Sequence, residues 1–195
     1  GGGMGDIGVS TTPDAYSLFW NPAKYAFAEK QFGVGVGYVP WLRGLVNDIG
    51  LSSVAGFWKI DSKQAIAMSL RFFSMGEVQY TDDQGVSLGN YKPNEFTIDA
   101  TYSRKFSPVI SGAVAARFIY SNLTPGYNST VETRPGISVA ADIALLYHKE
   151  LEISGIAGAA VNFSMNISNI GSKISYSSTS LMKHFIPTNL RLGPS

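Results

Sequence analysis

The sequence contains no cysteine and few charged side chains. Cysteine is absent from all 195 residues, which excludes disulfides, thiolate metal sites and cysteine nucleophiles. Charged residues make up 15% of the chain, against about 25% in ordinary soluble domains. The 15 basic and 14 acidic side chains leave a net charge of +1, so no strong field is available to hold a nucleic-acid backbone. We therefore expect no nucleic-acid partner.

Long hydrophobic runs are also absent. A membrane-spanning helix needs about 20 mostly apolar residues, and the longest apolar stretches, such as residues 155–161, are much shorter. The first residues are glycines, without the basic and apolar regions of a signal peptide, so we expect a processed or trimmed product. Two classes remain: a soluble all-β protein, and a membrane barrel whose strands each carry one apolar face.

Alternation of apolar and polar residues predicts a series of strands. In residues 65–73, every second residue from Ile66 to Phe72 is apolar, and Arg71 lies on the opposite face. Most of the strands are longer than the usual length in soluble sheets and match the about 9 to 11 residues that cross a bilayer when tilted. The facing of one of them, 51–60, stays open. The predicted strands are 31–39, 51–60, 65–73, 94–103, 110–121, 138–148 and 155–168, with 189–192 as the beginning of an eighth.

The connections between these strands alternate in length. Consecutive antiparallel strands turn at alternate ends, so this alternation gathers the short turns at one rim and the long loops at the other, as in outer-membrane barrels. In a soluble β-sandwich, nothing would place the short turns at one end and the long loops at the other. The sequence therefore predicts an all-β fold, a transmembrane antiparallel up-and-down β-barrel. The long connections are 40–50, 74–93, 122–137 and 169–187, and the short ones are 61–64, 104–109 and 149–154.

One charge lies on the polar face of each of four adjacent predicted strands, with alternating sign. These side chains are Arg71, Asp99, Arg117 and Asp142. Opposite charges on neighbouring strands can pair, whereas an arginine facing lipid at the midplane would cost about 2 to 4 kcal/mol. We therefore predict a ladder of luminal ion pairs. Four solvated charges outside a soluble sheet would be the alternative.

Residues 1–30 do not continue the strand pattern. Residues 14–20 indicate a short helix or turn that ends at Asn21-Pro22. On the first strand, Gly33, Gly35 and Gly37 leave one face without side chains, which makes room for a segment inside the barrel. We predict that residues 1–30 form a luminal plug, or hatch, and that 31–195 form the first half of an outer-membrane barrel.

A family resemblance appears in the same N-terminal region. Residues 4–9 (MGDIGV), then 13–15 (PDA) and 20–27 (WNPAKYAF), resemble the amino-terminal signature of the PorV/PorQ family of outer-membrane proteins, in its PorV (LptO) form, and 187–193 (PTNLRLG) also fit. The triplet Asn21, Pro22 and Ala23 is similar to the hatch motif of the wider FadL-like superfamily, which has fourteen-stranded barrels. The resemblance covers this chain but only the first half of the family's length, which implies that about seven or eight of the strands are present and that the chain is truncated.

The resemblance implies a role in the type IX secretion system of Bacteroidetes, in the outer membrane. Such proteins receive cargo by its C-terminal signal domain, take it from the type IX translocon channel protein and pass it to a surface-attachment complex. Candidate partner contacts here are Trp41 and Leu42 in the first long loop, because aromatic residues dominate interface energies. Trp41 fits an aromatic belt against membrane lipid equally well. The alternative function is FadL-like transport of hydrophobic small molecules.

Catalysis has little support in the sequence. Neither His148 nor His184 lies in a catalytic or metal-binding motif. The glycines from Gly33 to Gly37 lack the helix and acidic residue of a dinucleotide site. We expect a non-enzymatic protein without cofactor or metal. A third reading, a soluble all-β binding module, requires that the chain stay soluble without detergent.

Overall fold

A computed structural model of the chain describes residues 8–41, 48–82, 84–123, 134–151, 159–177 and 183–195. Two short 3₁₀ helices come first, η2 (Ser17–Phe19) and η3 (Pro22–Phe27). In the described part of the chain, no helix has the length and apolar composition needed to cross a membrane. The strands are β1 (Phe32–Pro40), β2 (Ile49–Lys59), β3 (Gln64–Met75), β4 (Val78–Thr81), β5 (Ser87–Tyr91), β6 (Asn94–Lys105), β7 (Ile110–Asn122), β8 (Gly136–Glu150), β9 (Ala160–Gly171) and β10 (Asn189–Pro194).

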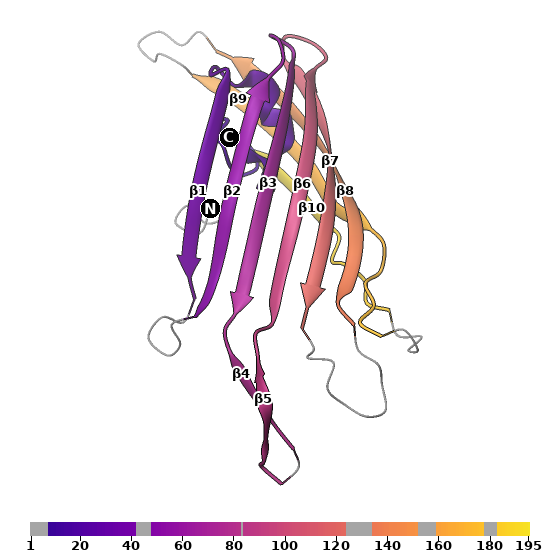
Figure 1. Cartoon of the computed structure of the whole chain (residues 1–195). Helices are drawn as coiled ribbons and strands as arrows, with labels where there is room; N and C mark the ends of the chain where they lie inside the picture. Colours follow the sequence, from indigo (N-terminus) through magenta and orange to yellow (C-terminus); the bar gives the residue numbers. More distant parts are fainter. Residues whose placement is uncertain (1–7, 42–47, 83, 124–133, 152–158, 178–182) are drawn as a thin grey trace.

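Eight strands form one antiparallel sheet in the order β1-β2-β3-β6-β7-β8-β9-β10, and β4 and β5 form a separate two-stranded ribbon. The order follows the chain, which confirms the predicted all-β, up-and-down arrangement. In the described residues the sheet stays open, with β1 and β10 at its two edges. The sheet curves around the N-terminal segment, residues 8–30, and the β4–β5 ribbon extends beyond one end (Figure 1).

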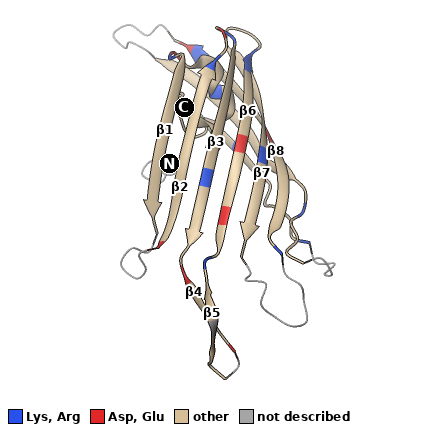
Figure 2. Ribbon diagram, in the orientation of Figure 1, with Lys and Arg blue, Asp and Glu red and all other residues tan. Residues whose placement is uncertain are grey.

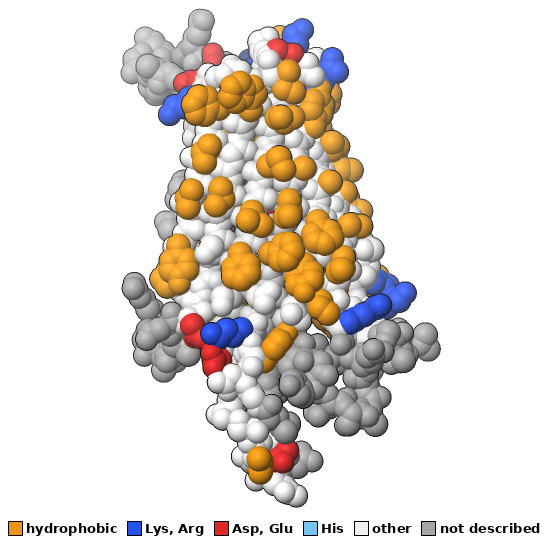
Figure 3. All heavy atoms as spheres, in the orientation of Figure 1, with side chains coloured by type: hydrophobic (Ala, Val, Ile, Leu, Met, Phe, Trp, Pro, Cys, Tyr) orange, Lys and Arg blue, Asp and Glu red, His pale blue; other side chains and the backbone are white. Residues whose placement is uncertain are grey.

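The two faces of the sheet differ as the alternation predicts. Met68 on β3 is 62% exposed, while its neighbours Ala67 and Ser69 are buried on the inner, concave face. The uncertain facing of β2 is also settled, because Trp58 is exposed and Phe57 is buried. Large apolar side chains are spread over the outer face between the two ends (Figure 3). A soluble sheet has the opposite arrangement, with its large apolar residues inside.

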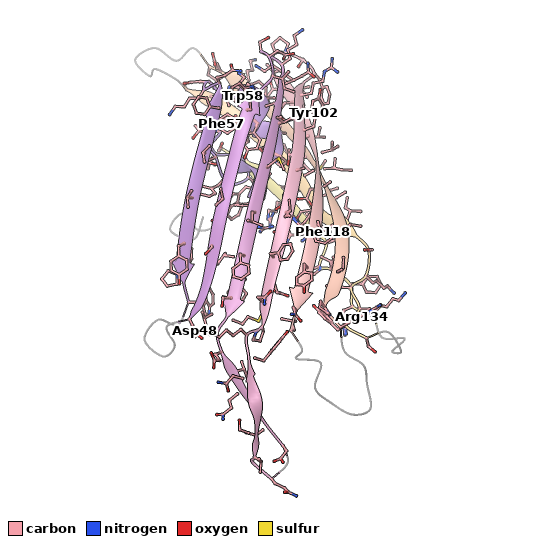
Figure 4. The ribbon with its side chains drawn as sticks, in the orientation of Figure 1. Asp48, Phe57, Trp58, Tyr102, Phe118 and Arg134 are labelled. Atoms are coloured by element: carbon pink, nitrogen blue, oxygen red, sulfur yellow. The ribbon has the colours of Figure 1, made fainter. Side chains whose placement is uncertain are left out.

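The connections alternate between the two ends of the sheet, but they do not sort strictly by length as predicted. Connections 60–63, 106–109 and 151–159 join strands at one end, called here the short-turn end, and connections 41–48, 76–93, 123–135 and 172–188 join them at the other, the long-loop end. Because β9 begins at Ala160, the connection 151–159 has nine residues, one more than 41–48. Trp58 and Tyr102 mark the short-turn end, and Asp48 and Arg134 the long-loop end (Figure 4). Antiparallel strands joined in chain order place successive connections at alternate ends.

Most strand ends lie within two residues of the prediction, and three features differ by more than this. The long connection 74–93 contains the β4–β5 ribbon, whose turn forms because the Asp82 carboxylate accepts hydrogen bonds from the N–H groups of Gln84 and Val86. The strand predicted from residue 155 begins at Ala160, which pairs with Glu150 at the end of β8. Residues 155–158 lie outside the described residues.

The third difference is at Asn21-Pro22, which starts a helix instead of only ending one. The Asn21 side chain accepts a hydrogen bond from the N–H of Ala23 at 2.9 Å, and Pro22 occupies the first helical position of η3. An asparagine cap followed by proline is a recognised start signal, since proline lacks the N–H that would have no partner there. The sequence therefore held the information for η3.

Candidate functional site

Tyr25 joins the N-terminal segment to the inner face of the sheet. Its side chain is fully buried, and its hydroxyl donates to the carbonyl of Ala15 at 3.0 Å and accepts from the N–H of Leu18 at 2.9 Å. The ring stacks on Phe57 of β2 with a centroid distance of 5.0 Å. Burial raises the pKa of the Tyr25 phenol, so the group stays protonated and keeps both hydrogen bonds.

The predicted hatch triplet Asn21, Pro22 and Ala23 is buried against three neighbouring strands. On β8, the carbonyl of Leu145 accepts from the Asn21 amide at 3.1 Å. On β7, the hydroxyl of Ser111 donates to the Ala23 carbonyl at 2.8 Å. On β9, the Asn166 amide donates to the carbonyl of Trp20, just before the triplet, at 2.8 Å. Whether the triplet acts as a hatch stays a prediction.

The glycine face of β1 receives the same segment. A Cβ atom placed on Gly35 would lie 2.8 Å from the ring of Tyr16 and 3.1 Å from Cβ of Ala15. Only glycine allows this approach without displacing the segment.

Lys24 is a buried cation that sequence reasoning missed. Its side chain is 1% exposed, and its ammonium donates to the carbonyl of Gly8 at 2.9 Å and to the hydroxyl of Thr11 at 3.2 Å. Burial lowers the pKa of Lys24 to about 8, and the negative charge of Asp14 partly offsets this effect. No local pattern marks Lys24, because its partners precede it by 16 and 13 residues.

The pKa of Lys24 predicts a pH dependence of stability. Below about pH 8 the amine is charged in both the folded and the unfolded chain, and burial of the charge destabilises the fold. Between about 8 and its unperturbed value of 10.5, the unfolded chain binds more protons, so stability rises with pH. We expect the difference in free energy of unfolding between the wild type and Lys24→Met to move in favour of the wild type across this window. Urea unfolding in detergent at each pH measures this free-energy difference. A difference that does not change with pH would contradict the lowered pKa of Lys24.

The four charges of the predicted ladder lie on the inner face of adjacent strands, and the structure brings them together. Asp99 is fully buried and contacts Arg117 at 2.5 Å and Arg71 at 3.6 Å. Arg117 also contacts Asp142 at 3.0 Å. Asp99 lies directly opposite Arg117 in the register of β6 and β7, whereas the other two pairs are diagonal. Figure 2 shows charged positions of both signs within the strands of the sheet.

Asn169 extends this network and was not predicted. It adopts a φ of 61° where the register between β8 and β9 shifts, so its side chain joins the inner face. Its N–H donates to Asp142 at 2.8 Å, and its side-chain oxygen accepts from Arg117. An irregularity of this kind leaves no trace in a two-residue period.

Two arginines connect the sheet to the N-terminal segment. Arg71 of β3 lies over the ring of Phe19, 4.6 Å from its centroid, and Arg191 of β10 lies 5.5 Å from that of Trp20. Cation–π contacts of this kind stabilise by about 0.5 to 2 kcal/mol, more where water is excluded. The segment is therefore held at Phe19 and Trp20 by contacts from β3 and β10, which are far apart in the sheet.

One of the two predicted partner contacts, Trp41, lies at the long-loop end. Trp41 directly follows β1 and is 58% exposed. Leu42 lies outside the described residues. Among the residues that the structure describes, no three His, Asp or Glu side chains come together in a way that could hold a metal ion. His148 faces inward, with its ring 4.9 Å from that of Phe27 and its Nδ1 2.6 Å from the side-chain oxygen of Asn162.

Comparison with known families identifies the chain. A family model described as "Type IX secretion system protein PorV" matches residues 1–195. The chain belongs to the PorV family. PorV is a component of type IX secretion and not a known family of enzymes, and the match confirms the resemblance seen in the sequence. No curated protein matches the chain.

Proposed function

We propose that this PorV-family protein binds the C-terminal signal domain of secreted cargo at the outer membrane, takes it from the translocon channel and passes it to the surface-attachment complex. Membership in the type IX secretion family supports the setting. The observation that carries the proposal is the contrast between an occupied inner face and an exposed long-loop end. Contacts with cargo would then be made outside the sheet, at its long-loop end.

The outer face supports a location in a bilayer. Val36, Met68 and Val114 are more than half exposed and lie on strands that are separated in the sheet. The ion pairs of Asp99 lie on the opposite face, where the Asp99 side chain is fully buried. A face of exposed aliphatic residues is stable in hydrocarbon and costly in water. Aromatic residues near both ends, such as Tyr38 and Trp58, fit the interfacial girdles of outer-membrane barrels.

The attachment of the N-terminal segment favours the shuttle over FadL-like transport. Passage of a small molecule along the inner face would require the segment to leave its hydrogen bonds to Ser111, Leu145 and Asn166. Each such bond contributes about 0.5 to 1.5 kcal/mol, and the contacts of Arg71 and Arg191 add to them. A segment held in this way serves better as a permanent plug than as a gate.

The β4–β5 ribbon is a suitable contact for a β-rich signal domain. Its base is fixed, since Glu77 pairs with Lys92 at 3.0 Å and the Glu77 N–H donates to Asp48 at 2.7 Å. Beyond this base the ribbon extends away from the sheet (Figure 1). A two-stranded ribbon has backbone edges to which a further strand can be added. Trp41 would add an aromatic anchor beside it at the same end.

Co-purification of a tagged signal domain tests the proposal. We expect Trp41→Ala, and separately the replacement of residues 78–91 by a short Gly-Ser turn, to lower recovery about tenfold or more, as for loss of an interface anchor. Trp58→Ala is the matched control, because Trp58 is 54% exposed on the outer face but lies at the short-turn end. Unchanged recovery with both long-loop variants, or equal loss with Trp58→Ala, would contradict the proposal.

A further inference from the structure

Charged side chains in the eight-stranded sheet are almost confined to its inner face. Alternation and side-chain contacts place there Lys59, Arg71, Glu95, Asp99, Lys105, Arg117, Asp142, Glu150 and Arg191. Within these strands, Arg104 and Lys149 are the exceptions, because both alternate with exposed apolar residues of the outer face. Both exceptions are cations, and both lie at the short-turn end of their strands.

Arg104 and Lys149 have similar surroundings. Arg104 follows Tyr102 by two residues on β6, and Lys149 follows Tyr147 by two residues on β8, so each tyrosine lies about 7 Å further into the apolar band. Both tyrosines are exposed on the outer face. Between these strands, Phe106 lies over Gly112 of β7, where an added Cβ would lie 2.6 Å from its ring. Hydrophobic side chains border the charged ones at this end (Figure 3).

Among the described residues, no ion pair involves Arg104 or Lys149. In the register, Arg104 lies opposite Gln64 and Gly112, and Lys149 lies opposite Val161, so no acidic residue faces either cation across the sheet. In the described part of the strands, the outer face therefore ends in positive charge at the short-turn end.

At the long-loop end, the last outward positions of β3, β6 and β7 are Ser74, Asn94 and Asn122, which are uncharged. Arg134, Lys173 and Lys183 also lie at that end, but in the connections and not in the strands. Within the eight strands, outward charge is therefore found at the short-turn end alone. A bilayer offers negatively charged phosphates at the depth where a cation can follow an aromatic girdle.

We propose that Arg104 and Lys149 each bind the phosphate of an anionic phospholipid in the leaflet at the short-turn end. The proposal rests on the outer-membrane location proposed above. The cation would contact the phosphate, while Tyr102 or Tyr147 packs at the level of the glycerol groups. The contacts would fix the depth of the sheet and give it a preference for anionic lipid in that leaflet.

Lipid retention in nanodiscs tests this site. The full chain is reconstituted into discs of phosphatidylcholine with phosphatidylglycerol, and the lipids that stay bound are counted by native mass spectrometry. We expect the double variant Arg104→Gln/Lys149→Gln to lose its preference for phosphatidylglycerol, by about fivefold for each cation removed. Arg104→Lys is expected to keep it. The matched control is Lys105→Gln, which removes one charge beside Arg104 but on the inner face, where Lys105 lies over Phe27.

The possible results distinguish failure of the proposed lipid site from failure of the proposed membrane location. Equal preference in the double variant and the wild type would overturn the site, as would an equal loss with Lys105→Gln. Failure of the wild type to enter discs, while it stays soluble without detergent, would overturn the proposed location instead. Inorganic phosphate is expected to leave lipid retention unchanged, and displacement of the bound lipid by free phosphate at millimolar concentration would also overturn the lipid assignment.

Discussion

Replacing Asp99 with asparagine is expected to lower the free energy of unfolding by about 3 to 5 kcal/mol, the cost of removing one partner from a buried ion pair. The Asp99 carboxylate is fully buried and contacts Arg117, Arg71 and the hydroxyl of Ser69. Asparagine keeps the shape but leaves two arginines sharing the charge of Asp142 alone. Its amide N–H groups would also face donors instead of acceptors.

Urea unfolding in detergent measures this effect, with Glu95→Gln as the matched control. Glu95 lies four positions earlier on the same face of β6, and its hydrogen-bond partner is the neutral hydroxyl of Ser121. Glutamine keeps an oxygen that can accept from Ser121, so the expected cost is no more than about 1 kcal/mol. Equal effects of Asp99→Asn and Glu95→Gln would show that the ion pairs contribute nothing beyond ordinary hydrogen bonds.

The coupling between Asp99 and Arg117 can be measured separately. We expect the Asp99→Asn/Arg117→Gln double variant to lose less stability than the sum of the two single variants, because either single change already breaks the shared contact. Additive losses would mean that the two residues stabilise the fold independently. This cycle tests the pair without depending on the absolute cost of burial.

The faces of the strands could be predicted from sequence, while the details of the network could not. A period of two places Arg71, Asp99 and Arg117 on the face opposite the large apolar residues of their strands. That Asp99 lies directly opposite Arg117, and that a bulge brings Asn169 to Asp142, depends on the register and on a local φ of 61°. Neither the register nor this local φ can be predicted from composition or from the alternation of residues.

The N-terminal segment was harder to predict from the sequence than the strands, because its contacts also lie outside any regular pattern. The glycines of β1 predicted a close approach, and Tyr16 and Ala15 do approach Gly35. The contacts that hold the segment are irregular and distant in sequence: the bond from Asn166 to Trp20 spans 146 residues. A 3₁₀ helix of six residues is too short for a periodic pattern, so only its Asn21-Pro22 cap was readable.

Tyr25→Ala is expected to lower the free energy of unfolding by about 3 to 5 kcal/mol, as for other buried aromatic residues. The change removes the stack on Phe57 and leaves both the Leu18 N–H and the Ala15 carbonyl without their partner. Tyr25→Phe keeps the stack and removes only the hydroxyl, so its expected cost is about 1 to 3 kcal/mol. The order of the two variants therefore separates packing from hydrogen bonding, and thermal unfolding in detergent gives both values.

The same variant also distinguishes a plug from a gate. Because Tyr25 joins η2, η3 and β2, its truncation loosens the segment from the inner face while the bonds of Asn21 and Ala23 to β8 and β7 remain. If the segment is a permanent plug, Tyr25→Ala lowers stability but creates no uptake of fatty acid, and cargo recovery per folded molecule is unchanged. Saturable uptake by the wild type, increased by Tyr25→Ala, would favour transport over the shuttle. Tyr102→Ala on the outer face provides the control, since it removes a tyrosine without touching the N-terminal segment.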